Sequence, residues 1–341
     1  MGEYTSFNGD VFHVNEEFFM SWVQDVFSVP LMPIEGDVLM PEPEVSLPKY
    51  GVSAIFLAHA EEYFTRFKNY DYLYTLMSET FERLDYVPKG LVVDFGSGFG
   101  NSVIPLLENY DVQVIATDIS PDLLRILKRE ARSRGFQDRC AAVAQDAQNC
   151  YFLPKHADLV VGCAVLHHMV EPMALVRAAI TVLKPGGKAI FFEPFELGHQ
   201  ILQIAYKQIL AEAKNRQLKG PGFDYLAALN HDIHVRTHRN RLAGFEDNWK
   251  NLDDKWMFCA SHFKKISDEL GCKIEILPLH NNQHQFTRQT KTALESYGGL
   301  KCPDALPDWA WSILNDFDEN YFSPEGLMDL PIEACVVITA L

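Results

Sequence analysis

The stretch LVVDFGSGFGNSVIPLL, residues 91–107, decides the fold of this chain. An apolar run typical of a β-strand contains an acid, Asp94, near its end. Three glycines then follow at alternate positions, and a helical pattern begins. Glycines let a backbone approach a ligand where a Cβ atom would clash, and a helix N-terminus offers N–H groups without intrahelical partners. The stretch therefore predicts a ligand-binding turn between a strand and a helix.

Strands and helices alternate beyond this turn. The strand candidates are LVVDF (91–95), VQVIATD (112–118), CAAVAQD (140–146), DLVVGC (158–163) and KAIFFEP (188–194). Helical patterns lie between them at 101–110, 120–135 and 171–187, and Ser120 is the expected N-cap of the second. Two further strands are expected at 272–279 and 333–341. Near-continuous apolar strands alternating with helices predict an α/β fold with a doubly wound, mostly parallel sheet.

Composition narrows the possible partners. The net charge of −16 repels phosphate backbones, so we expect no nucleic-acid partner. No apolar run approaches the roughly 18 residues of a membrane span, so we expect no membrane partner. The seven cysteines are scattered without a C-x-x-C pair, which favours reduced thiols and a cytoplasmic location. A homodimer is compatible with these features.

Acids at the strand ends indicate which ligand the glycine turn binds. The glycine spacing is G-x-G-x-G rather than the dinucleotide G-x-G-x-x-G, and Asp94 would repel a pyrophosphate but suit a cation. Asp118 ends the next strand, where a carboxylate can accept both ribose hydroxyls. Asp146 ends the third strand, where an adenine amino group could donate to it. Cation, ribose and adenine together predict S-adenosylmethionine, with a nicotinamide-dependent oxidoreductase as an alternative.

Five segments resemble the successive motifs of the class I S-adenosylmethionine-dependent methyltransferases. They are DFGSGFG, ATDIS, AQDAQ, DLVVGCAVLHHM and LKPGGKAIFFEP, and the resemblance covers about residues 88–195 plus the two late strands. It implies a seven-stranded Rossmann-like sheet whose last strand is antiparallel, and an enzyme that converts S-adenosylmethionine to S-adenosylhomocysteine. The cofactor-binding residues that it implies are Asp94, Gly96, Ser97, Gly98, Asp118, Ile119, Asp146, Ala147 and Cys163.

The remaining chain is expected to cover the strand ends. We expect a helical, aromatic N-terminal segment at 1–87, a core at 88–195 and 269–341, and a helical lid at 196–268. The family usually has a short link between its last two strands, whereas here a long insertion runs from 280 to 332. Extra segments that enclose the strand ends favour a small molecule as the methyl acceptor. The atom that receives the methyl group could be O, N or C. A methyltransferase for protein or peptide side chains, or a non-methylating S-adenosylmethionine-binding protein, are alternatives.

Catalytic candidates follow the fourth and fifth strands. His167 and His168 stand at the expected methyl site, and histidine titrates near neutral pH, so either could accept a proton. Glu193 ends the fifth strand at the same edge and could orient a substrate group. Tyr63 and Tyr70, in the aromatic segment before the core, could close over the methionine end and contact substrate.

The most unusual short segment is HDIHVRTHRNR, residues 231–241. Arginine forks bind carboxylates and phosphates, so Arg236 and Arg239 are candidates for binding an anionic substrate. On a helix, His231, His234 and His238 would share one face, which leaves zinc as an alternative. The preferred prediction has no metal in the site.

Overall fold

The computed structural model describes residues 21–42, 57–238, 248–279 and 283–340. A nine-stranded sheet crosses the described molecule in the order β1-β2-β5-β4-β3-β6-β7-β9-β8. All seven predicted strands are present: β3 (Gly90–Phe95), β4 (Val112–Asp118), β5 (Cys140–Ala144), β6 (Ala157–Cys163), β7 (Leu183–Pro194), β8 (Lys273–Pro278) and β9 (Glu333–Thr339). β9 is antiparallel to both β7 and β8, which confirms the predicted antiparallel last strand, but the described sheet has nine strands rather than the predicted seven.

The strand order places the ligand-binding edge. β3 pairs in parallel with β4 on one side and with β6 on the other, so the chain reverses its direction of progress across the sheet at β3. In an open α/β sheet such a switch point opens a crevice at the carboxyl ends of the strands. The glycine turn after β3 and the histidines after β6 therefore lie at the same edge.

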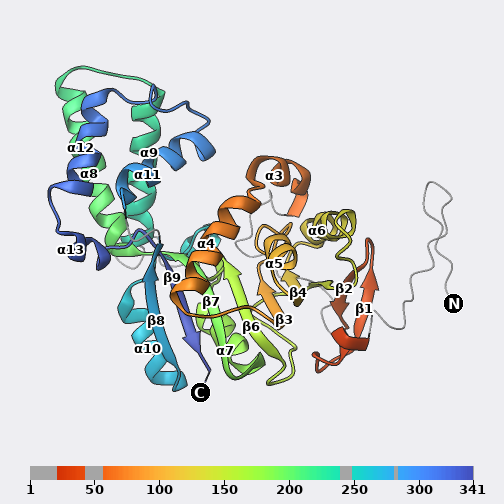
Figure 1. Cartoon of the computed structure of the whole chain (residues 1–341). Helices are drawn as coiled ribbons and strands as arrows, with labels where there is room; N and C mark the ends of the chain where they lie inside the picture. The colour runs from red at the N-terminus through yellow and green to blue at the C-terminus, as the bar shows by residue number, and fades with distance from the viewer. Residues whose placement is uncertain (1–20, 43–56, 239–247, 280–282, 341) are drawn as a thin grey trace.

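The N-terminal segment is helical at Ala60–Phe67 and Tyr70–Arg83, as predicted, but an earlier part of it forms strands. Residues Leu31–Ile34 and Val38–Pro41 form β1 and β2, an antiparallel hairpin that extends the sheet beside β5. Gly36 and Asp37 turn the hairpin with positive φ angles. Pro33 and Pro41 lack N–H groups, so this stretch is a poor candidate for a central strand. The hairpin tolerates them because it lies at the outer side of the sheet. Figure 1 shows the hairpin at the edge of the sheet opposite β8.

Helices cover both faces of the sheet. α4 (Tyr70–Arg83), α5 (Val103–Asn109) and α6 (Pro121–Ser133) pack on one face. α7 (Pro172–Val182) and α10 (Ala260–Leu270) pack on the other face. Ser120 is the N-cap of α6, as predicted, because its side chain accepts a hydrogen bond from Leu123 N at 3.3 Å. α3 (Ala60–Phe67) lies over α6 and the glycine turn through Phe99.

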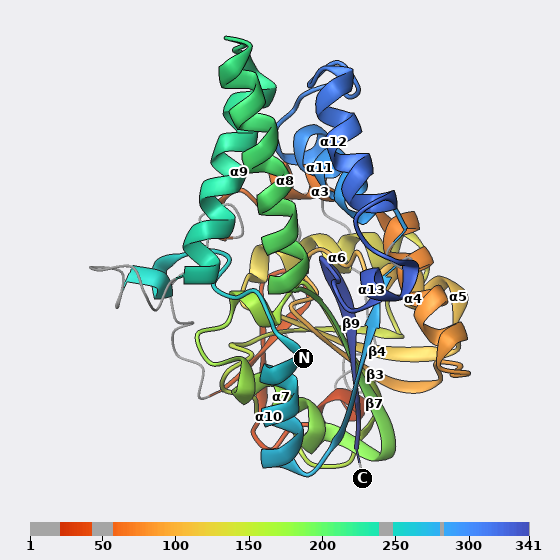
Figure 2. The same cartoon turned by 90° about the vertical axis from the view of Figure 1, so that its left-hand side faces the viewer.

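A second helical body stands beyond the strand ends, and we call it the cap. It comprises α8 (Glu196–Asn215), α9 (Pro221–His238), α11 (Gln285–Thr292), a π-helical turn η4 (Ala293–Tyr297), α12 (Asp308–Glu319) and α13 (Pro324–Met328). These elements share a hydrophobic core of their own. Figure 2 shows α8 and α9 running beside α11 and α12 above the sheet. The predicted lid and the predicted insertion thus pack together, whereas α10, inside the predicted lid, packs on the sheet.

Close backbone contact joins the two halves of the cap at Gly222. A Cβ atom on Gly222, in α9, would lie 1.9 Å from the carbonyl oxygen of Ala305, which precedes α12. We expect Gly222→Ala to lower the free energy of unfolding by about 1–3 kcal/mol, because the backbone of one half must move away. Gly220→Ala is the matched control, since nothing lies within 4 Å of its added Cβ. Equal denaturation midpoints for the two variants would contradict this packing.

Candidate functional site

Hydrogen bonds to β4 hold the glycine turn in place. Gly96 and Gly98 have φ angles of 66° and 52°, a conformation that favours glycine. Gly98 N donates to Asp118 Oδ2 at 2.8 Å, and Ser97 N donates to the carbonyl oxygen of Thr117 at 3.0 Å. The turn and the end of β4 therefore form one rigid ligand-facing unit.

One carboxylate oxygen of Asp94 accepts no hydrogen bond from the described residues. The residue is fully buried in β3, and Ser102 Oγ donates to its Oδ2. Among the described residues, nothing hydrogen-bonds to Oδ1. Burial raises the pKa of Asp94 to about 7, and the nearby Asp118 adds to the rise. A buried oxygen without a donor fits a cationic ligand, so this site fits the ammonium- and sulfonium-bearing end of S-adenosylmethionine.

Asp118 retains capacity for a ribose. It is half-buried at the end of β4, and its Oδ1 accepts from Ser120 N at 2.8 Å. Burial raises its pKa to about 6, with the backbone N–H groups of Ser120 and Gly98 acting in the opposite direction. Each carboxylate oxygen has two acceptor positions, so two bonded N–H groups leave room for hydroxyl donors. Ile119, next along the chain, is half-buried beside it.

The turn after β5 uses Asp146 internally. This buried carboxylate accepts from Gln148 N at 3.0 Å and from Asn149 Nδ2 at 3.2 Å, and Ala147 beside it is buried. The structure thus places Asp146 as a support of the turn where an adenine is expected. Cys163 ends β6 and is half-buried, and burial followed by the charge of Asp94 raises the pKa of its thiol.

Glu193, at the end of β7, organises the loop after β6. Its carboxylate accepts the backbone N–H groups of Val165 at 3.1 Å, Leu166 at 2.7 Å and His167 at 3.2 Å. His167 Nδ1 also donates to it, at 2.7 Å. Four donors surround a carboxylate whose side chain is fully buried, so Glu193 fixes the 3-10 turn η1 (Leu166–His168) and the plane of the His167 ring.

The two histidines are in opposite protonation states. Burial alone would lower the pKa of His167, but Glu193 and Asp254 outweigh it and raise the pKa to about 9. Its Nε2 lies 3.5 Å from Asp254 Oδ1. Burial and the charge of His167 lower the pKa of His168 to about 3, and its Nδ1 donates to the carbonyl oxygen of Asp253 at 2.9 Å. At neutral pH His167 is therefore an imidazolium and His168 is neutral.

The segment 253–256 was missed by the sequence analysis, because no motif marks it. Lys255 N and Trp256 N both donate to the carbonyl oxygen of His167, at 2.8 and 3.2 Å. Asp254 Oδ2 lies 3.2 Å from Arg236 Nη1, and Arg236 Nη2 donates to the carbonyl oxygen of Trp256 at 3.0 Å. Arg236 is thus a buried partner of this segment. Arg239, the other predicted substrate arginine, lies outside the described residues.

The two predicted tyrosines contact different parts of the structure. Tyr63 packs edge-on against Phe99 of the glycine turn at 5.6 Å between ring centroids. Burial raises the pKa of its phenol, and the nearby Tyr297 and Asp118 raise it further, so Tyr63 lies near the cofactor site. Tyr70 instead turns away and donates to Glu130 on α6 at 3.1 Å.

Asn101 is a second missed residue, and it follows the glycine turn directly. Its Oδ1 accepts from Asn69 N and its Nδ2 donates to the carbonyl oxygen of Phe67, both at 2.9 Å. These bonds attach the bend between α3 and α4 to the turn. A single side-chain amide therefore positions the covering helices over the ligand-binding edge.

One group within the described residues has the spacing of metal ligands. His167, His168 and Asp254 each place a donor atom within 4.8 Å of the others. Both ring nitrogens of His167 already have protein partners, since Nδ1 donates to Glu193 and Nε2 lies 3.5 Å from Asp254 Oδ1. The histidines of α9 form no such group in the part of the chain that the structure describes, although the rings of His234 and His238 lie 4.4 Å apart.

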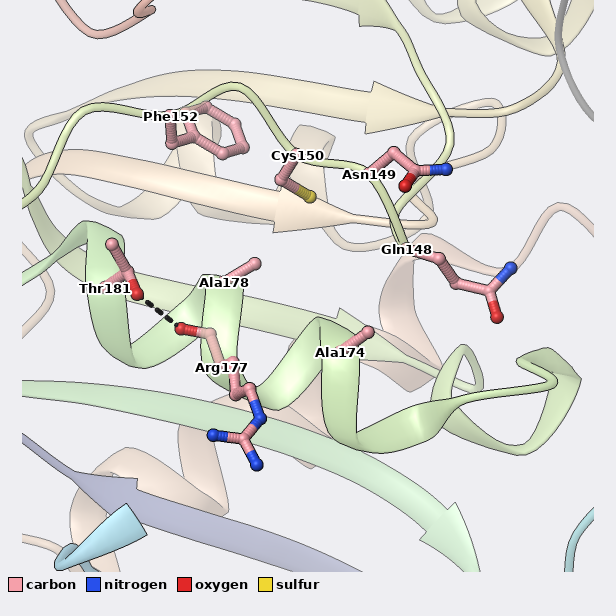
Figure 3. A pocket seen from close by; sticks show the side chains of 8 residues that line it. All are labelled: Gln148, Asn149, Cys150, Phe152, Ala174, Arg177, Ala178 and Thr181. Carbon is pink, nitrogen blue, oxygen red and sulfur yellow. Dashed lines mark hydrogen bonds between the residues drawn. The ribbon is translucent and has the colours of Figure 1, made fainter.

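A surface hollow lies on the far side of the Asp146 turn. It has a volume of about 270 Å³ and is lined by residues of the 148–152 segment and of α7, as Figure 3 shows. Its longest polar side chains are those of Arg177 and Gln148. None of the candidate cofactor or catalytic residues lines this hollow, although its lining residue Asn149 donates to Asp146.

Asp254 adds to the effect of Glu193 in raising the pKa of His167, which gives a pH-dependent prediction. The folded pKa of about 9 lies above the ordinary 6.5, so the stabilisation is complete below pH 6.5 and is lost as pH rises through 9. Asp254→Asn should lower the His167 pKa in a ring-NMR titration and shrink this pH-dependent loss of stability by about 1 kcal/mol. Asp268→Asn, at an exposed site on α10, should change neither quantity. An unshifted His167 titration would refute the pairing.

Comparisons with known proteins agree with this geometry. Residues 92–187 match the family described as "Methyltransferase domain". The chain is 26% identical to a phosphoethanolamine N-methyltransferase of Triticum aestivum over 181 residues, half of this chain and 35% of that protein. It is 24% identical to a 27-O-demethylrifamycin SV methyltransferase of Amycolatopsis mediterranei over 185 residues, 54% of this chain and 66% of that protein.

A solved structure gives a weaker likeness. The phosphoethanolamine N-methyltransferase 2 of Haemonchus contortus, in complex with S-adenosylhomocysteine, matches 78% of this chain and 52% of its own at 13% identity and a TM-score of 0.46. The matched regions span between about a third and two thirds of these relatives. No helix in the described part of the chain is both long and apolar enough to cross a membrane. The match therefore assigns residues 92–187 to the methyltransferase-domain family, in agreement with the class I, S-adenosylmethionine-dependent motifs of the sequence.

Proposed function

We propose that this chain transfers a methyl group from S-adenosylmethionine to a small molecule at the carboxyl edge of β3, β6 and β7. Two neighbouring features carry the proposal. One is the buried Asp94 oxygen that accepts no hydrogen bond, and the other is the glycine turn, whose Gly98 N–H donates to Asp118. Asp94 would hold the cationic end of the cofactor, and Asp118 its ribose. When bound, S-adenosylmethionine supplies a methyl group that is already activated for displacement, so protein residues mainly position the acceptor.

His168 is the histidine suited to contact the acceptor. His167 already carries a proton between two carboxylates, so it cannot take another. Neutral His168 donates through Nδ1 to the carbonyl oxygen of Asp253, which fixes the orientation of its ring at this edge. Its low pKa favours accepting a hydrogen bond from the acceptor over full protonation. Glu193 acts at one remove, by fixing the loop that carries both histidines.

A small-molecule acceptor is supported by what covers the edge. The segment 253–256 bonds to His167, α3 packs on Phe99 of the glycine turn, and Gln285 of the cap bonds to the residues just before β9. The named relatives methylate phosphoethanolamine or a rifamycin by their printed names, so two acceptor chemistries occur among them. The net charge of −16 disfavours a nucleic-acid substrate, because the chain would repel its phosphates. A protein side chain is the second candidate, since the cap could instead form a docking surface.

Methyl-labelled S-adenosylmethionine tests the proposal. The purified protein is incubated with a host-cell extract, and label is counted in small-molecule, protein and nucleic-acid fractions. We expect label in a small molecule, and loss of that label with Asp118→Ala, which should bind S-adenosylhomocysteine about ten- to a hundredfold more weakly. Label in protein would overturn the small-molecule assignment. Unchanged S-adenosylhomocysteine affinity in the variant would overturn the role of Asp118.

Asp94 gives a second, independent prediction. Its folded pKa of about 7 exceeds the ordinary 3.8, so the ligand-free protein should lose stability as pH rises from about 4 to 7. Asp94→Asn removes a buried charge and should stabilise ligand-free protein at pH 8 by about 1–3 kcal/mol. The same change should weaken S-adenosylhomocysteine binding about tenfold or more, because its ammonium loses a charged partner.

The exposed Asp111→Asn serves as the control for both measurements, since it changes the same net charge far from the site. Chemical denaturation and calorimetric titration at pH 8 provide the readouts. A destabilised Asp94→Asn with unaltered ligand affinity would show that Asp94 is only a structural group.

A further inference from the structure

The segment 253–256 bonds to two successive histidines of the turn after β6. The carbonyl oxygen of His167 accepts two backbone N–H groups of the segment, at 2.8 and 3.2 Å. The ring of His168 donates through Nδ1 to the carbonyl oxygen of Asp253, 85 residues away along the chain, at 2.9 Å. One short segment therefore holds both the backbone of this turn and the ring of its second histidine.

Trp256 extends these contacts to the next residue of the turn. Its indole Nε1 donates to the carbonyl oxygen of Met169 at 2.8 Å. The half-buried indole lies parallel to the ring of Phe258, at 6.2 Å between ring centroids. It also meets the ring of Trp249 edge-on at 5.6 Å. Because aromatic neighbours limit the orientations of the indole, its N–H group is directed at one place on the turn.

Different parts of the molecule hold the two sides of this turn. A 3-10 turn of three residues, such as η1, can pair few of its own N–H and carbonyl groups. Glu193 of the sheet accepts the N–H groups on one side. The segment 253–256 donates to the carbonyl oxygens on the other side, through two backbone N–H groups and the Trp256 indole. Loss of the segment's donors would therefore release the carbonyl side while Glu193 still held the N–H side.

Arg236 connects the segment to the cap. It lies on α9, and its Nη2 donates to the carbonyl oxygen of Trp256 at 3.0 Å. Its Nη1 lies 3.2 Å from Asp254 Oδ2, and its side chain is only 7% exposed. The guanidinium is thus bonded within the protein rather than open to the predicted anionic substrate. A shift of α9 would move Trp256 and, through it, the turn that carries His168.

We propose that Trp256 is a positioning residue for methyl transfer, which places His168 through its indole N–H and makes this placement depend on the cap through Arg236. This inference rests on the proposed function, in which His168 contacts the acceptor. Trp256 acts through the turn and requires no contact of its own with the reacting atoms. Displacement requires close alignment of the acceptor with the methyl group, and a misplacement of about 1 Å can cost about a hundredfold in rate.

The ring of His168 gives a readout that needs no acceptor. In the full chain with ¹⁵N-labelled histidines, a two-bond ¹⁵N–¹H correlation spectrum at pH 7.5 shows which ring nitrogen carries the proton. His168→Gln identifies the signal. We expect the proton on Nδ1 in the unaltered chain, because that nitrogen bonds to the carbonyl oxygen of Asp253. Trp256→Phe keeps an aromatic ring but loses the indole N–H, so a large part of the population should shift to the Nε2–H form.

Trp311→Phe is the matched control for this substitution. The indole Nε1 of Trp311 also donates to backbone carbonyl oxygens, those of Pro303 at 3.0 Å and Leu306 at 3.1 Å, but within the cap. Its loss should leave the His168 signal unchanged. An unshifted His168 signal in Trp256→Phe, or an equal shift in the control, would overturn the inference.

A second variant guards against a folding defect in Trp256→Phe. Arg236→Lys keeps a cation beside Asp254 but loses the second arm of the guanidinium, which bonds to Trp256. It should shift the His168 signal in the same direction. A folded Arg236→Lys with the signal of the unaltered chain would overturn the link to the cap.

Methyl transfer is measured with labelled S-adenosylmethionine across a dilution series of the host-cell extract. For Trp256→Phe we expect the plateau rate to fall about tenfold or more, while the half-saturating extract concentration and the S-adenosylhomocysteine affinity stay within about twofold. Equal losses of plateau rate and of S-adenosylhomocysteine affinity would make Trp256 a structural residue and overturn the inference. An unaltered chain that binds S-adenosylhomocysteine but labels no fraction would instead overturn the proposed function.

Discussion

The carboxylate of Glu193 is the group on which the site depends. Three backbone N–H groups and one imidazole N–H converge on it, so a fully buried charge is compensated by four hydrogen bonds. The loop after β6 acquires its shape from these bonds. His167, fixed and protonated by Glu193, then attracts Asp254, and Asp254 holds Arg236 of the cap. One strand-end acid therefore links the sheet, the histidine loop and the covering helices.

The acids at this edge differ in how many hydrogen bonds the protein donates to their carboxylates. Asp94 receives one hydroxyl donor, and one of its oxygens remains without a donor among the described residues. Leaving a buried or half-buried carboxylate unsatisfied costs free energy, and a protein retains that cost where a ligand removes it. The distribution of satisfied and unsatisfied acids thus separates supporting groups from ligand-facing groups.

The sequence predicts the parts of this molecule that are local in the chain. Each parallel strand is a short apolar run, and Asp94, Asp118 and Glu193 stand at strand ends, where topology brings them to one edge. Ser120 could be identified as a cap because its signal spans only four residues. The hairpin of β1 and β2 was missed because its prolines match no central strand, and only its outer position in the sheet makes them acceptable.

The rest of the site depends on contacts between distant segments. Asp254 has no motif of its own, and its role exists only because the chain between α9 and α10 returns to His167, 87 residues upstream. Asn101 is likewise an ordinary residue until folding places it beneath the α3–α4 bend. Motifs therefore identify the cofactor half of such a site, whereas residues that recognise the acceptor depend on how the cap packs.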